Sequence, residues 1–140
     1  MNHLSDTGKS EDSLLLKCLR LFDCYTSVIN ASEIFSGCNG KVQTDFAKSS
    51  FYGTGVLGIP YKYSFTIAKV LKSLGKFKLE NSYRDAVLVS VCMETKLPFL
   101  TLNEEKYKEI FRINKVKFVS KDLILQNNSP EIIFKKAKIL

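Results

Sequence analysis

Apolar residues along this chain follow two different spacings. In some stretches they recur every three or four positions, as on one face of a helix, and in others they form short runs rich in β-branched and aromatic residues, as in strands. Helices are predicted at residues 11–22, 30–35, 42–52, 63–74, 83–95 and 104–112, and strands at residues 24–29, 56–59, 97–102 and 116–119. Strands that alternate with helices predict an α/β fold with a parallel sheet covered on both faces.

Residues with special backbone preferences mark the ends of these elements. Asn30, with Glu33 three positions later, predicts a capping box at the start of the second helix. Ser82 is placed to cap the helix that begins after it, and Gly75 to end the helix that precedes it. From Ser129 onward, a last short helix or an extended tail is expected.

Composition limits the class of protein. A chain of 140 residues can bury a core of its own, and one domain spanning residues 1–140 is expected. No apolar run approaches the roughly 18 residues that cross a bilayer, and no signal peptide is expected. Cys18, Cys24 and Cys92 lie among apolar neighbours and are expected as buried thiols in a reducing cytoplasm. His3 is the only histidine, which disfavours a zinc site and a Ser-His-Asp site.

The chain is basic. Its formal net charge is +7 and its pI is about 9.2. This balance favours a polyanionic partner, although a solvated, lysine-rich surface explains the charge equally well. Charge alone therefore leaves the choice of partner open.

Polar side chains gather where predicted strands end and helices begin. Asp85 opens the apolar run Ala86–Val91, and Asn103 comes after the buried strand that starts at Leu97. Both positions belong at the carboxyl edge of a parallel sheet, where α/β proteins build their sites, and Glu33 stands at a third such position. A cluster of oxygen ligands without histidine or thiolate suits Mg²⁺ or Mn²⁺, which can orient water and neutralise a phosphodiester during in-line attack.

Each of these residues also has a purely structural explanation. Glu33 completes the capping box with Asn30, and Asp85 lies in the first turn of a helix, where the macrodipole favours any acid. Thr101 to Asn103 form a strand end and then a helix cap. It is the joint arrangement of the three segments that favours a functional site.

Several segments, taken in order, match one family pattern. TSVINASEIFSG at 26–37 is similar to the strand-to-helix segment S-V-I-x-x-x-E-L-x-x-G, and VLGIP at 56–60 is similar to the short strand that comes later. RDAVLVSV at 84–91 is similar to the motif D-A-L-I-A-A, and PFLTLN at 98–103 to the strand P-L-V-T-x-D/N. VKFV at 116–119 fits the last strand. Together these segments resemble a PIN domain of the type found in VapC toxins, over nearly the whole chain.

The resemblance implies a three-layer α/β sandwich with a short parallel sheet flanked by helices. It also implies a Mg²⁺- or Mn²⁺-dependent ribonuclease, often the toxin of a toxin–antitoxin pair. RNA, an antitoxin protein and a second copy of the chain in a homodimer are the implied partners. The residues that it assigns to the site are Glu33, Asp85 and Asn103 at the metal, Thr101 and Asn103 beside the metal-bound water, and Arg84, Lys76 and Lys78 at the RNA phosphates.

The chain departs from the family at two places. PIN domains begin with a central strand that ends in D-T-N, whose aspartate is the first metal ligand, whereas this sequence opens on residues that resemble the segment after that strand. Asp6-Thr7-Gly8 imitates the motif without an apolar strand before it, and Asn103 stands where an acid is often found. A missing central strand predicts a gapped or rearranged sheet, or marginal stability, because its neighbours lose their ladder partners.

Two functions therefore remain open. The first is a metal-dependent endoribonuclease of the PIN type, with weak metal affinity because only Glu33 and Asp85 are clear acids. The second is a catalytically inactive PIN-like module that binds RNA or a protein. A nucleotide-binding α/β domain is disfavoured, because the sequence has no G-x-G-x-x-G or P-loop motif.

Overall fold

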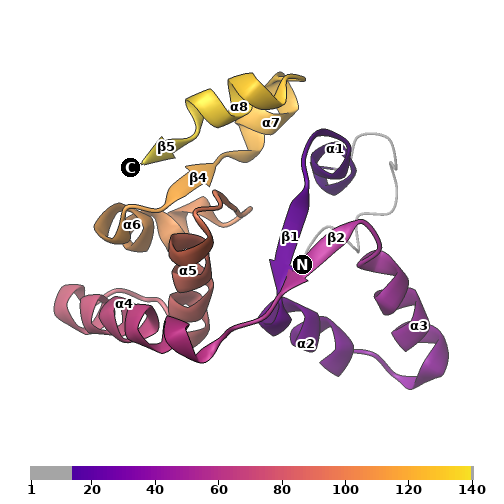
Figure 1. Cartoon of the computed structure of the whole chain (residues 1–140), viewed down its shortest axis with the longest axis horizontal. Helices are drawn as coiled ribbons and strands as arrows, with labels where there is room; N and C mark the ends of the chain where they lie inside the picture. The colour runs from indigo at the N-terminus through magenta and orange to yellow at the C-terminus, as the bar shows by residue number, and fades with distance from the viewer. Residues whose placement is uncertain (1–13, 140) are drawn as a thin grey trace.

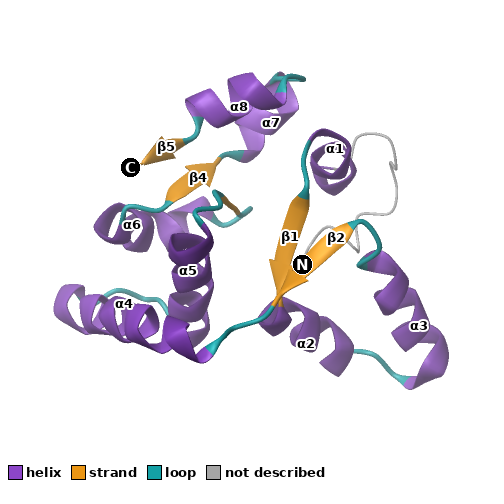
Figure 2. Ribbon diagram, viewed as in Figure 1, coloured by secondary structure: helices purple, strands orange, loops and turns teal. Residues whose placement is uncertain are grey.

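The computed structural model describes residues 14–139, which form a mostly helical α/β protein (Figures 1 and 2). The helices are α1 (Leu14–Leu21), α2 (Val28–Ser36), α3 (Gly40–Ser50), the 3₁₀ turn η1 (Tyr61–Tyr63), α4 (Ser64–Phe77), α5 (Tyr83–Thr95), α6 (Glu104–Asn114), α7 (Lys121–Gln126) and α8 (Pro130–Lys136). The strands are β1 (Cys24–Ser27), β2 (Thr54–Leu57), β3 (Phe99–Leu100), β4 (Lys117–Val119) and β5 (Lys138–Ile139). Within this range, no helix combines the length and the apolar character that crossing a bilayer requires.

The strands form two separate small sheets. β1 and β2 are parallel, and their register runs from Cys24 opposite Thr54 to Ser27 opposite Leu57. β3 is parallel to β4, and β4 pairs with the two-residue strand β5 in the antiparallel sense. Across residues 14–139, no ladder joins one sheet to the other. The division agrees with the expectation of a gapped sheet rather than with that of one continuous parallel sheet.

Two apolar clusters hold the elements together. The larger lies among α4, α5 and α6, where Val70, Val89 and Ile110 have no exposed surface. The smaller joins α1, α7, α8 and β4 and includes the buried Ile124 and Ile133. Full burial of such a side chain contributes about 1.5–3 kcal/mol, so each cluster is a substantial source of stability.

The start of α2 differs from the prediction. Ser27 is the N-cap, and its hydroxyl accepts a hydrogen bond from the backbone N–H of Asn30 across 3.2 Å. The prediction that Asn30 caps this helix, in a capping box with Glu33, is therefore wrong, because β1 ends two residues earlier than expected and the helix begins at Val28. The Glu33 side chain is left free to point at another element.

Lysines, rather than glycines, end the three central helices. α4 runs past Gly75, so the prediction that this glycine ends the helix is wrong. Lys78, Lys96 and Lys115 come directly after α4, α5 and α6 with φ angles of 50°, 60° and 55°. A left-handed backbone costs an L-residue about 1–2 kcal/mol, and glycine is the usual occupant of such a position. These three helix ends therefore carry local strain.

The C-terminal part contains one helix that the pattern did not predict. α7 starts after Ser120, whose hydroxyl accepts the backbone N–H of Leu123 across 3.1 Å. α8 begins after the cap Ser129 with Pro130 in its first turn, which confirms the expectation of a last short helix. β3 is confined to two residues of the predicted strand at 97–102.

Candidate functional site

Asp85 is a carboxylate with no exposed surface at the start of α5. It forms a capping box with Ser82: the Ser82 backbone N–H donates to Oδ2 across 2.9 Å, and the Asp85 backbone N–H donates to the Ser82 hydroxyl across 3.4 Å. The Tyr107 hydroxyl donates to Oδ1 across 2.6 Å, and Lys106 Nζ lies 3.1 Å from Oδ2. Both oxygens of the buried charge are therefore paired, as burial of a charge requires.

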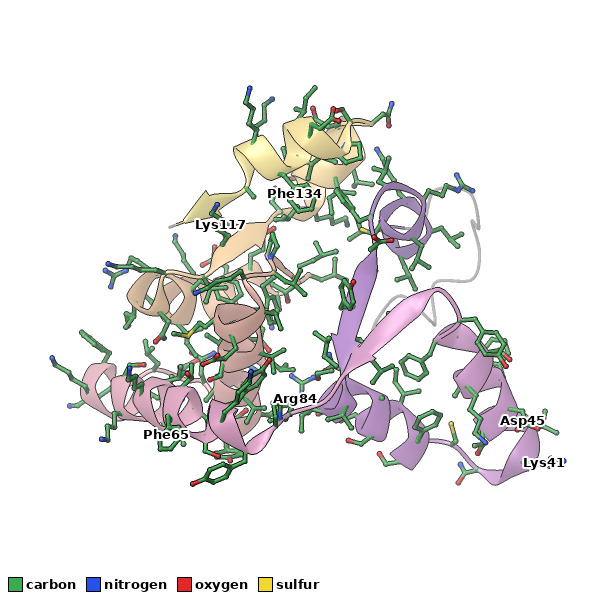
Figure 3. All side chains as sticks on the ribbon, viewed as in Figure 1. Lys41, Asp45, Phe65, Arg84, Lys117 and Phe134 are labelled. Atoms are coloured by element: carbon green, nitrogen blue, oxygen red, sulfur yellow. The ribbon has the colours of Figure 1, made fainter. Side chains whose placement is uncertain are left out.

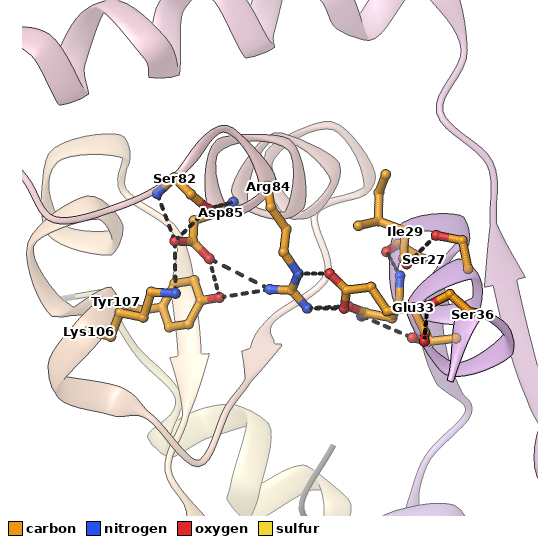
Figure 4. Close-up of polar contacts among 12 residues, drawn as sticks. Ser27, Ile29, Glu33, Ser36, Ser82, Arg84, Asp85, Lys106 and Tyr107 are labelled. Carbon is orange, nitrogen blue, oxygen red and sulfur yellow. Dashed lines mark hydrogen bonds and ion pairs between the residues drawn. The ribbon is translucent and has the colours of Figure 1, made fainter. Parts of the chain in front are cut away.

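Arg84 extends from the same turn of α5 toward α2 (Figure 4). Its Nε and Nη2 donate to the two carboxylate oxygens of Glu33, the Nη2–Oε2 distance being 2.8 Å. Nη2 also donates to Asn30 Oδ1 across 2.8 Å, and Nη1 donates to the Tyr107 hydroxyl across 3.4 Å. The guanidinium fork therefore ties α2 to α5 and reaches α6. We call Asn30, Glu33, Ser82, Arg84, Asp85, Lys106 and Tyr107 the polar network.

The network keeps its acids charged. Burial raises the pKa of Asp85, but hydrogen bonds from its neighbours, that of Tyr107 foremost, outweigh burial and hold the pKa below its usual value. The hydrogen bond from Arg84 lowers the pKa of Glu33 against an opposing effect of burial. Burial, with the hydrogen bond to Asp85, raises the pKa of Tyr107, so the phenol keeps the proton that it donates.

Four members of the polar network are not among the predicted site residues: Asn30 and Ser82 are predicted only as helix caps, and Lys106 and Tyr107 have no predicted role. Lys106 and Tyr107 lie in the first turn of α6, within the helix that the sequence predicts at residues 104–112. Tyr107 shares the apolar face of α6 with Ile110 and Phe111, and all three are buried. A phenol on a buried face needs a hydrogen-bond partner, and that requirement is the signal in the sequence that could have revealed it.

The remaining predicted residues lie outside the network. Asn103 is exposed at the N-cap position of α6, and its backbone N–H donates to the Thr101 hydroxyl across 3.1 Å. No hydrogen bond or ion pair in the described part of the chain joins either residue to Glu33 or Asp85. Lys76 and Lys78 are exposed at the end of α4. The remaining candidate acid, at position 6, lies outside the described residues.

The polar network, in this arrangement, does not fit a divalent metal. The oxygens of Glu33 and Asp85 that a hard cation would need are bonded to Arg84, Lys106 and Tyr107. The positive charges of Arg84 and Lys106 already balance the negative charges of the two acids. A metal cation would therefore have to displace both side chains to reach the carboxylates.

Comparison with known proteins assigns no family to the chain. No protein-family model matches it, and no curated protein matches it either. The polar network and the charge around it are therefore the features from which a function can be inferred.

Proposed function

We propose that this chain is a PIN-like module that binds RNA without cleaving it. The observation that carries the proposal is the state of the two acids: every carboxylate oxygen of Glu33 and Asp85 accepts a hydrogen bond or lies in an ion pair with the chain's own residues. Arg84 and Lys106 supply the positive charge that a metal would otherwise supply. The network then serves to join α2, α5 and α6, and the two small sheets are the interrupted central layer of a three-layer sandwich.

RNA is the favoured ligand because basic and aromatic side chains alternate in the segment of the chain that leads into the network. Lys76, Phe77 and Lys78 are all exposed, and Lys76 Nζ lies 5.5 Å from the centre of the Phe77 ring. Lys78 is four residues from Ser82, so the two Cα atoms are at most about 14 Å apart. Lysines neutralise phosphates, and an exposed ring stacks on an unpaired base. Single-stranded RNA offers both groups together.

The direct test is binding of a fluorescent single-stranded RNA, measured by anisotropy over a series of salt concentrations. The variant with Lys76→Gln and Lys78→Gln should bind more weakly, and the slope of log K against log salt should fall by about 0.7 for each phosphate that is no longer neutralised. Phe77→Ala should weaken binding without changing that slope, because stacking releases no counterions.

Lys41→Gln is the matched control for these variants. Lys41 is exposed near the start of α3, well away from Arg84 in Figure 3. The change removes one positive charge without touching the Lys76–Lys78 segment. If Lys41→Gln weakened RNA binding as much as Lys76→Gln, the effect would depend only on net charge. That result would contradict a defined RNA site.

A metal-dependent endoribonuclease is the second candidate. It is favoured by one observation: Glu33 and Asp85, 52 positions apart, both contact the side chain of Arg84. In this alternative, Mg²⁺ or Mn²⁺ would displace Arg84 and Lys106, and Glu33, Asp85 and Asn103 would be its ligands. An antitoxin partner and a homodimer, which the PIN resemblance also implies, stay predictions.

Incubation with RNA and Mn²⁺ separates the two candidates. The binding module predicts intact RNA and an affinity that Mn²⁺ does not raise. Cleavage that needs Mn²⁺ and is lost in Glu33→Gln would decide for the nuclease. Glu33 is the residue to change because its side chain is 38% exposed, so the variant keeps the fold more readily than a change at the fully buried Asp85.

A further inference from the structure

A groove of about 370 Å³ lies between the two sheets, beside the polar network. All four residues of β1 line it, and β3 contributes Phe99 and Leu100. Leu88 on α5 and Phe134 on α8, the latter labelled in Figure 3, also line it. The groove is therefore bounded by strands of both sheets and by helices from both halves of the chain.

Both strands leave an edge without a partner. β1 pairs only with β2, and β3 pairs only with β4 among strands in residues 14–139. The second edge of each strand therefore has backbone N–H and C=O groups that no ladder satisfies, and such an edge is a template for pairing with another chain. Because β1 and β3 line the same groove, one added strand would satisfy both edges and join the two sheets.

The lining specifies the chemistry of the occupant. It is mostly apolar, and Asp23 is the only charged residue that contributes to it among residues 14–139. A strand that fits the groove is therefore apolar except at the end nearest Asp23, where it carries a basic residue. Residues 1–13 supply a poor match, since Met1 and Leu4 are their only apolar side chains and three of the others are acids.

We propose that this groove is the docking site for an apolar β-strand of another polypeptide. The strand matches the four-residue length of β1 and carries a basic residue beside Asp23. Its backbone pairs with β1 and β3, and its side chains fill the apolar space against α5. The proposal concerns a surface that the RNA-binding function does not use, so each can fail while the other holds.

Three thiols allow the docking to be measured in the full chain. Cys18, Cys24 and Cys92 line the groove, whereas Cys38 lies outside it, after the end of α2. Burial raises the pKa of Cys18 to about 11 and that of Cys92 to about 12, and it also raises the pKa of Cys24. Alkylation by N-ethylmaleimide at alkaline pH, mapped by mass spectrometry, therefore reports on the groove, with Cys38 as the internal control.

The probe is the synthetic peptide acetyl-KVIVV-amide. At about ten times its Kd it should slow alkylation of Cys24 about tenfold, since about one groove in ten stays open, and leave Cys38 unchanged. The control peptide acetyl-KVIPV-amide should protect far less, because proline has no N–H to donate to a ladder. Leu97→Trp, which fills the groove, should abolish protection, and Val42→Trp, on the exposed face of α3, should not.

Three results would overturn the proposal. Equal protection by the two peptides would show apolar adsorption instead of strand pairing. Faster alkylation of Cys24 in the full chain with Leu4→Asp, without any peptide, would show that the chain's own N-terminal residues occupy the groove. Slower alkylation of Cys24 with rising protein concentration, again without peptide, would show that a second copy occupies it.

Discussion

The Tyr107 hydroxyl donates a hydrogen bond of 2.6 Å to Oδ1 of Asp85 and so joins α6 to the first turn of α5. The ring is held in place, because it stacks on Phe111 at 5.4 Å between centres and lies 5.1 Å from the ring of Phe99. The hydroxyl also accepts from Arg84 across 3.4 Å. One phenol therefore connects the buried acid to the partly exposed ion pair of Arg84 with Glu33.

We expect Tyr107→Phe to destabilise the protein by about 1–3 kcal/mol, because it leaves one oxygen of a buried carboxylate short of its donor while keeping the ring. Urea unfolding followed by circular dichroism measures this loss. Tyr83→Phe is the control, since Tyr83 is 64% exposed and should change stability by less than about 0.5 kcal/mol. Equal effects of the two changes would mean that the Asp85 contact contributes nothing.

Stability should fall in acid. The pKa values of Glu33 and Asp85 are both lowered in the folded chain, so their contribution is complete above their unfolded values and is lost as the pH falls through the folded ones. We expect the urea midpoint to decline from about pH 5 to about pH 3. Glu33→Gln should make this decline shallower, because it removes one of the two groups. Parallel curves for the two proteins would contradict a titrating Glu33–Arg84 pair.

The ion pair between Arg84 and Glu33 should contribute little to the stability of the fold. The side chains of Arg84 and Glu33 are 35% and 38% exposed, so solvent screens their attraction. In a double-mutant cycle with Glu33→Gln and Arg84→Met, we expect a coupling energy of about 0.5–1 kcal/mol. Hydrogen exchange should show that α2 opens faster in either single variant than in the unchanged protein, because the ion pair ties α2 to α5. A coupling of several kcal/mol would mean that the network excludes water far better than these exposures indicate.

Local signals in the sequence were enough to predict α5, its N-terminal cap and the site residues in its first turn. Ser82 and Asp85 lie three positions apart before an apolar run, and the structure has the helix and its cap at those positions. Arg84 and Asp85, in the first turn of α5, are predicted site residues and belong to the polar network. Helix capping depends on neighbours within one turn, which explains why this much was readable from the chain alone.

Contacts between residues far apart in the sequence could not be predicted from it. Arg84 was expected at a phosphate, and its pairing with Glu33 depends on the packing of α2 against α5, which no local pattern specifies. The role of Ser27 could not be decided from the sequence, because a serine suits a strand end and a helix cap equally. Since Ser27 is the cap, Asn30 lies inside the helix. The Asn103 side chain stayed outside because the first turn of α6 directs Lys106 and Tyr107, not Asn103, at Asp85.

Relief of backbone strain at the end of α6 should stabilise the chain. Lys115 has φ 55° and ψ 41°, a left-handed conformation that glycine adopts without a steric penalty. We expect Lys115→Gly to raise the free energy of unfolding by about 0.5–1 kcal/mol, even though glycine is more flexible when unfolded. Lys115→Ala is the matched control: it removes the same charge and keeps the Cβ, so it should give no gain. A gain with alanine equal to that with glycine would assign the effect to the lost charge instead of to the backbone.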